Sequence, residues 1–300
     1  MSISHYIKDI GRGRDGARAL DRAQAADLMG QILDGHVTDL ELGAFCIAMR
    51  IKGETDQEMA GFLDATHARL QHISAASPVV VLPSYNGARK LPVLTPLLAH
   101  LLAREGLAVV MHGTATESAR ITSQDVLSAM GVSPLSQPGA IQAGEVVFAP
   151  TEVLCPNLKR LLDVRRVVGL RNPAHSLVKL MNPTMAADAL LIGSYTHPEY
   201  AISMAATFEL TGARALLLRG TEGEVVADPR RTPQMAAFVR GTRTTLVEAH
   251  TGSLIKLPEL PTDIDAASTA GYTQAVLKGE LPVPAPLATQ VQAVLKALSL

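Results

Sequence analysis

Hydrophobic residues in the first seventy positions recur with helical spacing, and a capping residue precedes each run. Asp21, Thr38 and Thr55 stand directly before the three runs, where a side-chain oxygen can accept a hydrogen bond from the free N–H groups of a first helical turn. A glycine follows each of the first two runs, as is common where helices end. The pattern predicts three helices and, from them, a small all-helical domain over residues 1–72.

After Pro78 the pattern changes, and short apolar runs rich in β-branched residues alternate with runs of helical spacing. Strands that are buried on both faces have continuous apolar sequences of this kind, so the alternation predicts a mainly parallel sheet covered by helices. The expected strands are residues 79–82, 108–111, 189–192 and 213–218, and the expected helices are residues 94–103, 123–130 and 200–210.

Two more helices are expected outside this alternation. Residues 159–172 have a basic amphipathic pattern within an inserted segment of about 152–178, which we expect to pack on the helical domain. A proline-rich break precedes a final helical run at residues 288–298. The predicted fold class is α/β, with a helical N-terminal domain and a larger α/β domain formed by residues 73–151 and 179–300.

Composition restricts the class of protein. The chain has 300 residues, of which 47% are hydrophobic and 3% aromatic, and it can therefore form a large core from Leu, Val and Ala. The longest apolar run, residues 91–111, contains His100, Arg104 and Glu105, so it is not expected to span a membrane. Residues 1–10 carry charge without an apolar signal segment, and we expect a cytoplasmic protein.

The cysteines and histidines do not form a metal-binding pattern. Cys46 and Cys155 have no partner at metal-ligand spacing, and the nine histidines form no HExxH or HxH pair. We therefore expect neither a disulfide framework nor a transition-metal site, and we expect no resident cofactor.

The formal net charge of −1 argues against a wholly basic nucleic-acid-binding protein, but binding depends on where the charges lie. Basic residues are bunched near the N-terminus, in the middle of the chain and near residue 230. Each cluster alone can be a solvated face balanced by nearby acidic residues, whereas three clusters favour a polyanionic partner. The candidate phosphate-contacting residues are Arg12, Arg14, Arg18, Lys159, Arg160, Arg165, Arg166, Arg230 and Arg231.

Residues 108–114, Ala-Val-Val-Met-His-Gly-Thr, have the pattern of a buried strand that runs into a phosphate-binding turn. Gly113 allows backbone N–H groups to approach a bound anion closely, but Met111 stands where a lysine would be useful for binding a pyrophosphate. The turn is thus predicted to have the shape of a phosphate site without its cation.

Several short motifs stand in order along the chain: residues 33–55, Phe148-Ala149-Pro150, Gly169-Leu170-Arg171-Asn172, Asn182-Pro183, His197-Pro198-Glu199 and residues 220–224. As a set and in this order, they resemble the motifs of anthranilate phosphoribosyltransferases. The resemblance implies a small helical domain, an α/β domain with a mainly parallel sheet, an active-site cleft between the domains, and a homodimer formed through the helical domain.

The same family binds phosphoribosyl pyrophosphate with a Gly-Thr-Gly-Gly-Asp loop and a Lys-His-Gly-Asn turn. An ungapped count places residues 83–87, Pro-Ser-Tyr-Asn-Gly, over the loop and residues 111–114 over the turn. Pro83 lacks an N–H donor and Tyr85 replaces a glycine, so the resemblance implies a weakened phosphate site. Its remaining candidate residues are Ser84, Asn86, Gly87, Thr95, His112, Gly113, Thr114, Ser118 and Arg120.

The metal-binding and acceptor positions of the family are also altered. An Asp-Glu pair holds magnesium in the family, and here Glu224 and Glu222 stand in its place, although surface glutamates are the more common explanation for two such residues. Arg171 matches the arginine that faces the anthranilate carboxylate, and it can equally be a cation that stabilises a helix C-terminus.

Retained framework motifs and replaced loops make the chain similar to a branch of the family whose members are understood to bind nucleic acid. Our first hypothesis is a homodimer that binds DNA or RNA along the phosphate backbone, largely without sequence specificity, since the few aromatic residues argue against base stacking. The alternative is a phosphoribosyltransferase of altered acceptor specificity that uses phosphoribosyl pyrophosphate and magnesium. A third possibility is a dimeric scaffold for a protein partner.

Overall fold

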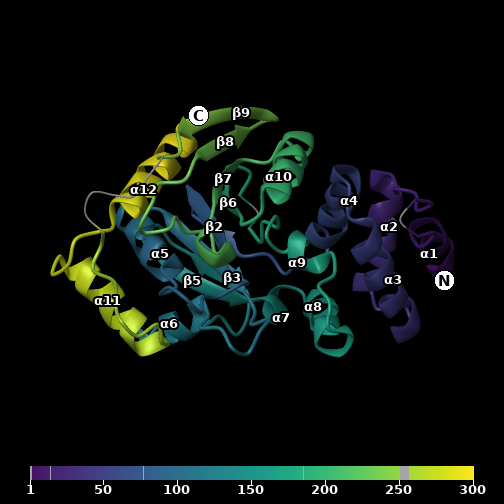
Figure 1. The fold of residues 1–300 in the computed structure, drawn as a ribbon, viewed down its shortest axis with the longest axis horizontal. Helices are drawn as coiled ribbons and strands as arrows, with labels where there is room; N and C mark the ends of the chain where they lie inside the picture. The colour runs from purple at the N-terminus through teal and green to yellow at the C-terminus, as the bar shows by residue number, and fades with distance from the viewer. Residues whose placement is uncertain (1, 14, 77, 185, 251–256) are drawn as a thin grey trace.

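A twisted sheet forms the centre of the larger part of the molecule (Figure 1). The computed structural model describes residues 2–13, 15–76, 78–184, 186–250 and 257–300. Within these residues the main sheet has seven strands in the order β5-β3-β2-β6-β7-β8-β9; the first five pair in parallel, whereas β8 pairs antiparallel with both β7 and β9. The strands are β2 (Val79–Pro83), β3 (Ala108–Gly113), β5 (Val146–Pro150), β6 (Leu190–Tyr195), β7 (Ala215–Arg219), β8 (Met235–Val239) and β9 (Thr242–Val247).

The strand register aligns the carboxyl ends of the parallel strands. Pro83 of β2 lies opposite His112 of β3, and Tyr195 of β6 lies opposite Arg219 of β7. The loops that follow these strands therefore meet at one edge of the sheet, which is where α/β proteins commonly bind ligands. A separate pair of short parallel strands, β1 (Ser74–Ala75) and β4 (Ala140–Ile141), lies outside the main sheet.

The helical domain begins with four helices at one end of the molecule (Figure 1). Asp21, Thr38 and Thr55 each accept a hydrogen bond from the backbone N–H of the third helical residue, and in each case that residue's side chain accepts one from the capping residue. The three predicted helices are thereby confirmed, whereas α1 was not predicted. The helices are α1 (Ser4–Ile10), α2 (Arg22–Leu33), α3 (Asp39–Lys52) and α4 (Asp56–His67).

Three helices follow β5: α7 (Thr151–Leu154), α8 (Pro156–Val168) and α9 (Ala174–Leu177). Helix α8 contacts α2 and α3, and α9 contacts α4. The predicted helix over residues 159–172 was wrong at both ends, because it begins at Pro156 and ends at Val168. Gly169 follows with a φ of +76°, a left-handed conformation that closes a helix, so Arg171 lies beyond the helix end.

Two apolar cores lie on opposite faces of the sheet. Val79 and Val81 face the core that extends into the helical domain, and Val80 and Leu82 face the other, as the alternation of side chains along a strand requires. Helix α10 (Pro198–Thr211) covers the first face and packs on α4. The second face is covered by α5 (Thr95–Arg104) and α12 (Ala285–Leu298), and α6 (Ser123–Ala129) and α11 (Ala266–Lys278) lie beside α5.

None of the helices in the described part of the chain combines the length and the apolar sequence that a membrane crossing requires. Cys46 and Cys155 are both buried as free thiols.

Candidate functional site

The loop after β2 surrounds a single buried carboxylate, that of Glu224, whose residue is 1% exposed. The backbone N–H groups of Asn86 and Gly87 each donate to Glu224 Oε1 at 2.9 Å. Ser84 Oγ and Thr95 Oγ1 donate to Oε2 at 2.5 and 3.0 Å. We name these four donors the anion cradle, because two amides and two hydroxyls aimed at one point form a binding site for an oxyanion.

Glu222 makes a second set of contacts with the same loop. Its carboxylate accepts hydrogen bonds from the backbone N–H groups of Lys90 at 2.9 Å and Leu91 at 3.1 Å, with Arg89 at 3.3 Å. Both glutamates belong to residues 220–224, the acidic turn, which follows β7 and contains the short 3-10 helix η1 (Thr221–Gly223). As placed, these carboxylates accept hydrogen bonds from N–H and O–H donors of the chain after β2.

The local sequence explains how these loops approach so closely. A Cβ on Gly113 would lie 1.9 Å from the carbonyl oxygen of Ser84, and a Cβ on Gly223 would lie 1.7 Å from Asn86 Nδ2. Gly87 and Gly223 have φ angles of +62° and +88°, which residues with side chains rarely adopt. The glycines therefore set the contact between the loops after β2, β3 and β7.

His112 lies beneath this loop and is fully buried. Its Nδ1 is 2.9 Å from the hydroxyl of Tyr85, which also accepts a hydrogen bond from Thr151 at 3.0 Å. Burial lowers the pKa of His112 to about 3, so the ring is neutral at neutral pH. Of the other predicted phosphate-site residues, Thr114 is half-buried and Ser118 is exposed, both on the loop before α6.

Three arginines converge on Glu117 from separate segments. Arg165 of α8 lies 2.8 Å from this carboxylate, Arg120 3.0 Å and Arg171 3.4 Å. The hydrogen bond from Arg165 is the largest cause that lowers the pKa of Glu117 to about 2. These contacts connect α8 to the loop between β3 and α6.

Lys179 adds a fourth cation beside Arg120 and Arg171, both of which affect its pKa. Burial lowers the pKa of Lys179 to about 8, while the Glu224 carboxylate acts in the opposite direction. The lysine Nζ donates to the carbonyl oxygen of Gly223 at 3.4 Å. Burial together with Arg171 lowers the pKa of the neighbouring His175 to about 4, so this ring is neutral at neutral pH.

Several of the predicted basic residues share carboxylates with one another. Asp163 contacts both Lys159 and Arg166, and Asp228 lies 2.9 Å from Arg230 and 3.6 Å from Arg231. Each of these two acids thus faces two cations, and the side chains of Arg166 and Arg231 are 65% and 61% exposed.

The remaining predicted basic residues belong to the groups near the N-terminus and in the middle of the chain. Arg160 pairs with Asp39 at 2.6 Å and Arg12 with Asp9 at 3.5 Å. Arg18 is exposed, and Arg14 lies outside the described residues.

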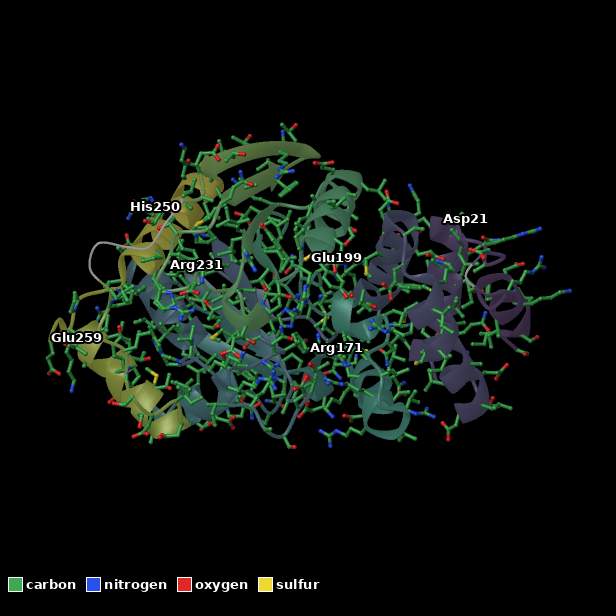
Figure 2. The ribbon with its side chains drawn as sticks, viewed as in Figure 1. Asp21, Arg171, Glu199, Arg231, His250 and Glu259 are labelled. Atoms are coloured by element: carbon green, nitrogen blue, oxygen red, sulfur yellow. The ribbon has the colours of Figure 1, made fainter. Side chains whose placement is uncertain are left out.

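The three clusters do not form one compact patch. Arg171 lies near the middle of the molecule and Arg231 lies over the α/β domain, while Asp21, three residues after Arg18, lies toward the far end of the helical domain (Figure 2). The clusters are therefore spread along the long axis.

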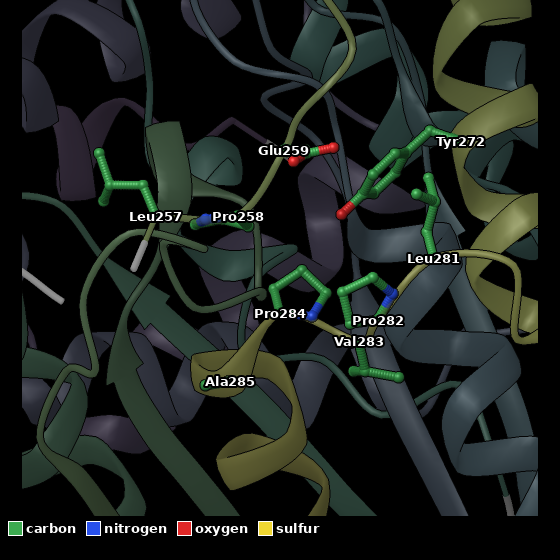
Figure 3. A pocket seen from close by; sticks show the side chains of 9 residues that line it. All are labelled: Leu257, Pro258, Glu259, Tyr272, Leu281, Pro282, Val283, Pro284 and Ala285. Atoms are coloured by element: carbon green, nitrogen blue, oxygen red, sulfur yellow. The ribbon is translucent and has the colours of Figure 1, made fainter. Parts of the chain in front are cut away.

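A hollow of about 300 Å³ lies elsewhere, between the chain after residue 257 and the start of α12 (Figure 3). It is lined by Tyr272, Leu281 and several prolines, and none of the predicted site residues contributes to it.

Sequence reasoning missed Glu117, Ser123 and Lys179. Ser123 Oγ lies 3.4 Å from Glu224, and Lys179 faces the acidic turn, but no motif marks either residue. In the sequence, Lys179 is recognisable only as a polar residue within an apolar segment.

Comparison with known proteins places this arrangement in a family. Residues 4–69 match the Glycosyl transferase family, helical bundle domain. The chain is 28% identical over 295 residues to the anthranilate phosphoribosyltransferase of Methanopyrus kandleri, covering 93% of this chain and 84% of that protein. The fold resembles that of anthranilate phosphoribosyltransferase from Thermus thermophilus, with a TM-score of 0.73 at 24% identity over 95% of this chain and 85% of that one.

The chain belongs to the anthranilate phosphoribosyltransferase-like family of glycosyl transferases. A relative along almost its whole length is the uncharacterized protein YbiB of Escherichia coli (strain K12), which is 41% identical over 304 residues and matches 99% of this chain and 94% of that protein. The family and fold predicted from the sequence motifs are thus confirmed.

Proposed function

We propose that the protein is a homodimer that binds the phosphate backbone of nucleic acid, largely without sequence specificity, and that it does not transfer phosphoribosyl groups. The observation that carries this proposal is the sharing of carboxylates by arginines: three contact Glu117 and two contact Asp228. Arg120 and Arg165 are only 14% and 23% exposed, but Arg171, Arg230 and Arg231 are 43%, 42% and 61% exposed. These three guanidinium groups share carboxylates with other arginines and can also reach phosphate oxygens, which guanidinium groups bind well.

The spread of these residues favours a long polyanion over a small one. Arg171 and Arg231 are well separated along the long axis (Figure 2), so one small anion would not reach both. The chain is 3% aromatic, which favours backbone contacts over stacked bases.

An exposed apolar stripe on α3 supports the proposed homodimer. Leu40 and Ile51 are 84% and 59% exposed, and Ala44 and Ile47 lie between them at helical spacing. A second copy of the chain that packed on this stripe would remove these side chains from water. The dimer would then carry two sets of arginines on one assembly.

Fluorescence anisotropy with labelled single- and double-stranded oligonucleotides tests the proposal. We expect the affinity to fall steeply with salt, with a log–log slope of about −0.9 for each phosphate neutralised on duplex DNA. Replacing Arg166 and Arg171 by alanine should weaken binding to all sequences and reduce the magnitude of the slope by about 1 per lost contact. Lys278 and Lys296, exposed on α11 and α12, provide a matched control, since their double alanine variant removes the same charge elsewhere.

Absence of binding at low salt, or an affinity that does not respond to salt, would contradict the proposal. Equal binding by the arginine variant and the wild-type protein would remove the assigned role of Arg166 and Arg171.

Phosphoribosyl transfer is the second candidate, and the sequence identity to the Methanopyrus kandleri enzyme favours it. It requires that phosphoribosyl pyrophosphate and magnesium enter the anion cradle, whose donors here contact Glu224. Calorimetric titration with that substrate and magnesium distinguishes the two candidates, because an enzyme must give a saturable heat of binding.

A further inference from the structure

Every contact of the anion cradle with Glu224 is a hydrogen bond donated from the cradle to the carboxylate. Two backbone N–H groups and two hydroxyls converge on one carboxylate group, and Ser123 adds a fifth, longer contact at 3.4 Å. Buried donors of this kind need an anionic or strongly polar partner, because leaving them unpaired costs about 1–3 kcal/mol each. In this protein the partner is a side chain of the same chain.

The backbone of the acidic turn holds Glu224 in this place. A Cβ on Gly220 would lie 1.9 Å from the carbonyl oxygen of Glu224, so the turn closes tightly on itself. The backbone N–H of Thr221 donates to the carbonyl oxygen of Val226 at 2.9 Å, which joins the two ends of the turn. Glu222 then fixes the outer side of the turn on the amides of Lys90 and Leu91. The carboxylate of Glu224 is thus directed into the cradle by the fold.

The charge of Glu224 is also balanced within the chain. Lys179 donates to the carbonyl oxygen of Gly223 and lies close enough for the Glu224 carboxylate to act on its pKa. A buried carboxylate with several hydrogen-bond donors and a nearby cation is stable in the absence of any bound ion.

We propose that Glu224 is the resident anion of the cradle and excludes free phosphate and pyrophosphate from it. Removing this carboxylate converts the cradle into a binding site for a phosphate-type oxyanion. Exclusion of small anions from the cradle does not depend on nucleic-acid binding, which is measured separately.

Thermal unfolding with added pyrophosphate, at constant ionic strength, tests the inference. The wild-type protein should show no saturable rise in Tm. The Glu224→Ala variant should show a saturable rise, of about 5 °C at a hundredfold excess over Kd, because a ligand that binds only the folded state stabilises it. Inorganic phosphate should act in the same direction more weakly.

Three further variants locate the effect. Glu280→Ala removes an exposed carboxylate after α11 and should leave the protein unresponsive, as the wild type is. Adding Thr95→Val to Glu224→Ala removes one cradle donor and should reduce or abolish the response. Glu224→Gln keeps the shape of the side chain without its charge, and it should respond less than Glu224→Ala because the amide still fills part of the cradle.

Two results would overturn the inference: a folded Glu224→Ala protein, judged by circular dichroism, that does not respond to pyrophosphate, or a saturable rise in the wild-type protein that Thr95→Val abolishes. If the Glu224 variants do not fold, the wild-type measurement and its Thr95→Val control decide alone. Oligonucleotide anisotropy on the same samples distinguishes this failure from failure of the proposed nucleic-acid binding.

Discussion

Glu117 offers a test in which stability and binding change in opposite directions. Its carboxylate holds Arg165, Arg120 and Arg171 together, and the contacts with Arg165 and Arg120 lower its pKa from 4.5 to about 2. Glu117→Gln removes the negative charge with little change in shape. The variant should therefore be less stable, while the released arginines should bind polyanions more tightly.

The magnitude of the stability change follows from the lowered pKa. A shift from 4.5 to about 2 corresponds to about 3 kcal/mol at roughly 1.4 kcal/mol per pKa unit. Because the Glu117 side chain is 25% exposed, solvent screening reduces this, and we expect a loss of about 2 kcal/mol at pH 7. The folded-state pKa is lowered, so this stabilisation is fully present above the unfolded-state pKa and is lost as the pH falls through about 2.

The binding change follows from charge. One negative charge removed within about 6 Å of a bound phosphate changes the interaction energy by about 1 kcal/mol in a well-hydrated site, which is about a fivefold gain in affinity. Urea unfolding measures the first effect and oligonucleotide anisotropy the second, with Glu280→Gln as the matched control. An unchanged unfolding free energy, or weaker binding by the variant, would refute the reasoning.

Three further predictions concern the helical domain and the buried histidine. Glu58→Ala should lower the free energy of unfolding by about 3–5 kcal/mol in urea titrations, because Lys52, 2.6 Å away and 7% exposed, loses its partner; a loss below about 1 kcal/mol would contradict this. Burial lowers the pKa of His112 to about 3, so the free energy of unfolding should fall by about 1.4 kcal/mol for each pH unit as the pH decreases from 6.5 to about 3. An equal pH slope in the His112→Asn variant would argue against this. If the protein is the proposed homodimer, Leu40→Asp with Ile51→Asp should convert it to a monomer in sedimentation velocity; an unchanged sedimentation coefficient would exclude α3 from the interface.

The helices of the N-terminal domain were predictable because their signals are local. Thr38 and Glu41 form a capping box, and their residue types and spacing of three are visible in the sequence. The parallel strands β2 and β3 were predictable from continuous apolar runs. Strand β9 was not, since it is exposed along most of its length and lacks the apolar pattern. Strand β8 was also missed, although it is a buried apolar run.

By itself, the sequence determined the α/β class, the capped helices and the family. Only the tertiary structure decided where the charges meet. Ser84 and Glu224 are 140 positions apart, and Arg165 and Glu117 are 48 apart. Capping and strand patterns act between near neighbours, whereas a hydrogen bond or ion pair across such separations forms only after the sheet has brought distant loops together. For this reason the sequence predicted a weakened phosphate site, and only the fold revealed a carboxylate of the chain within it.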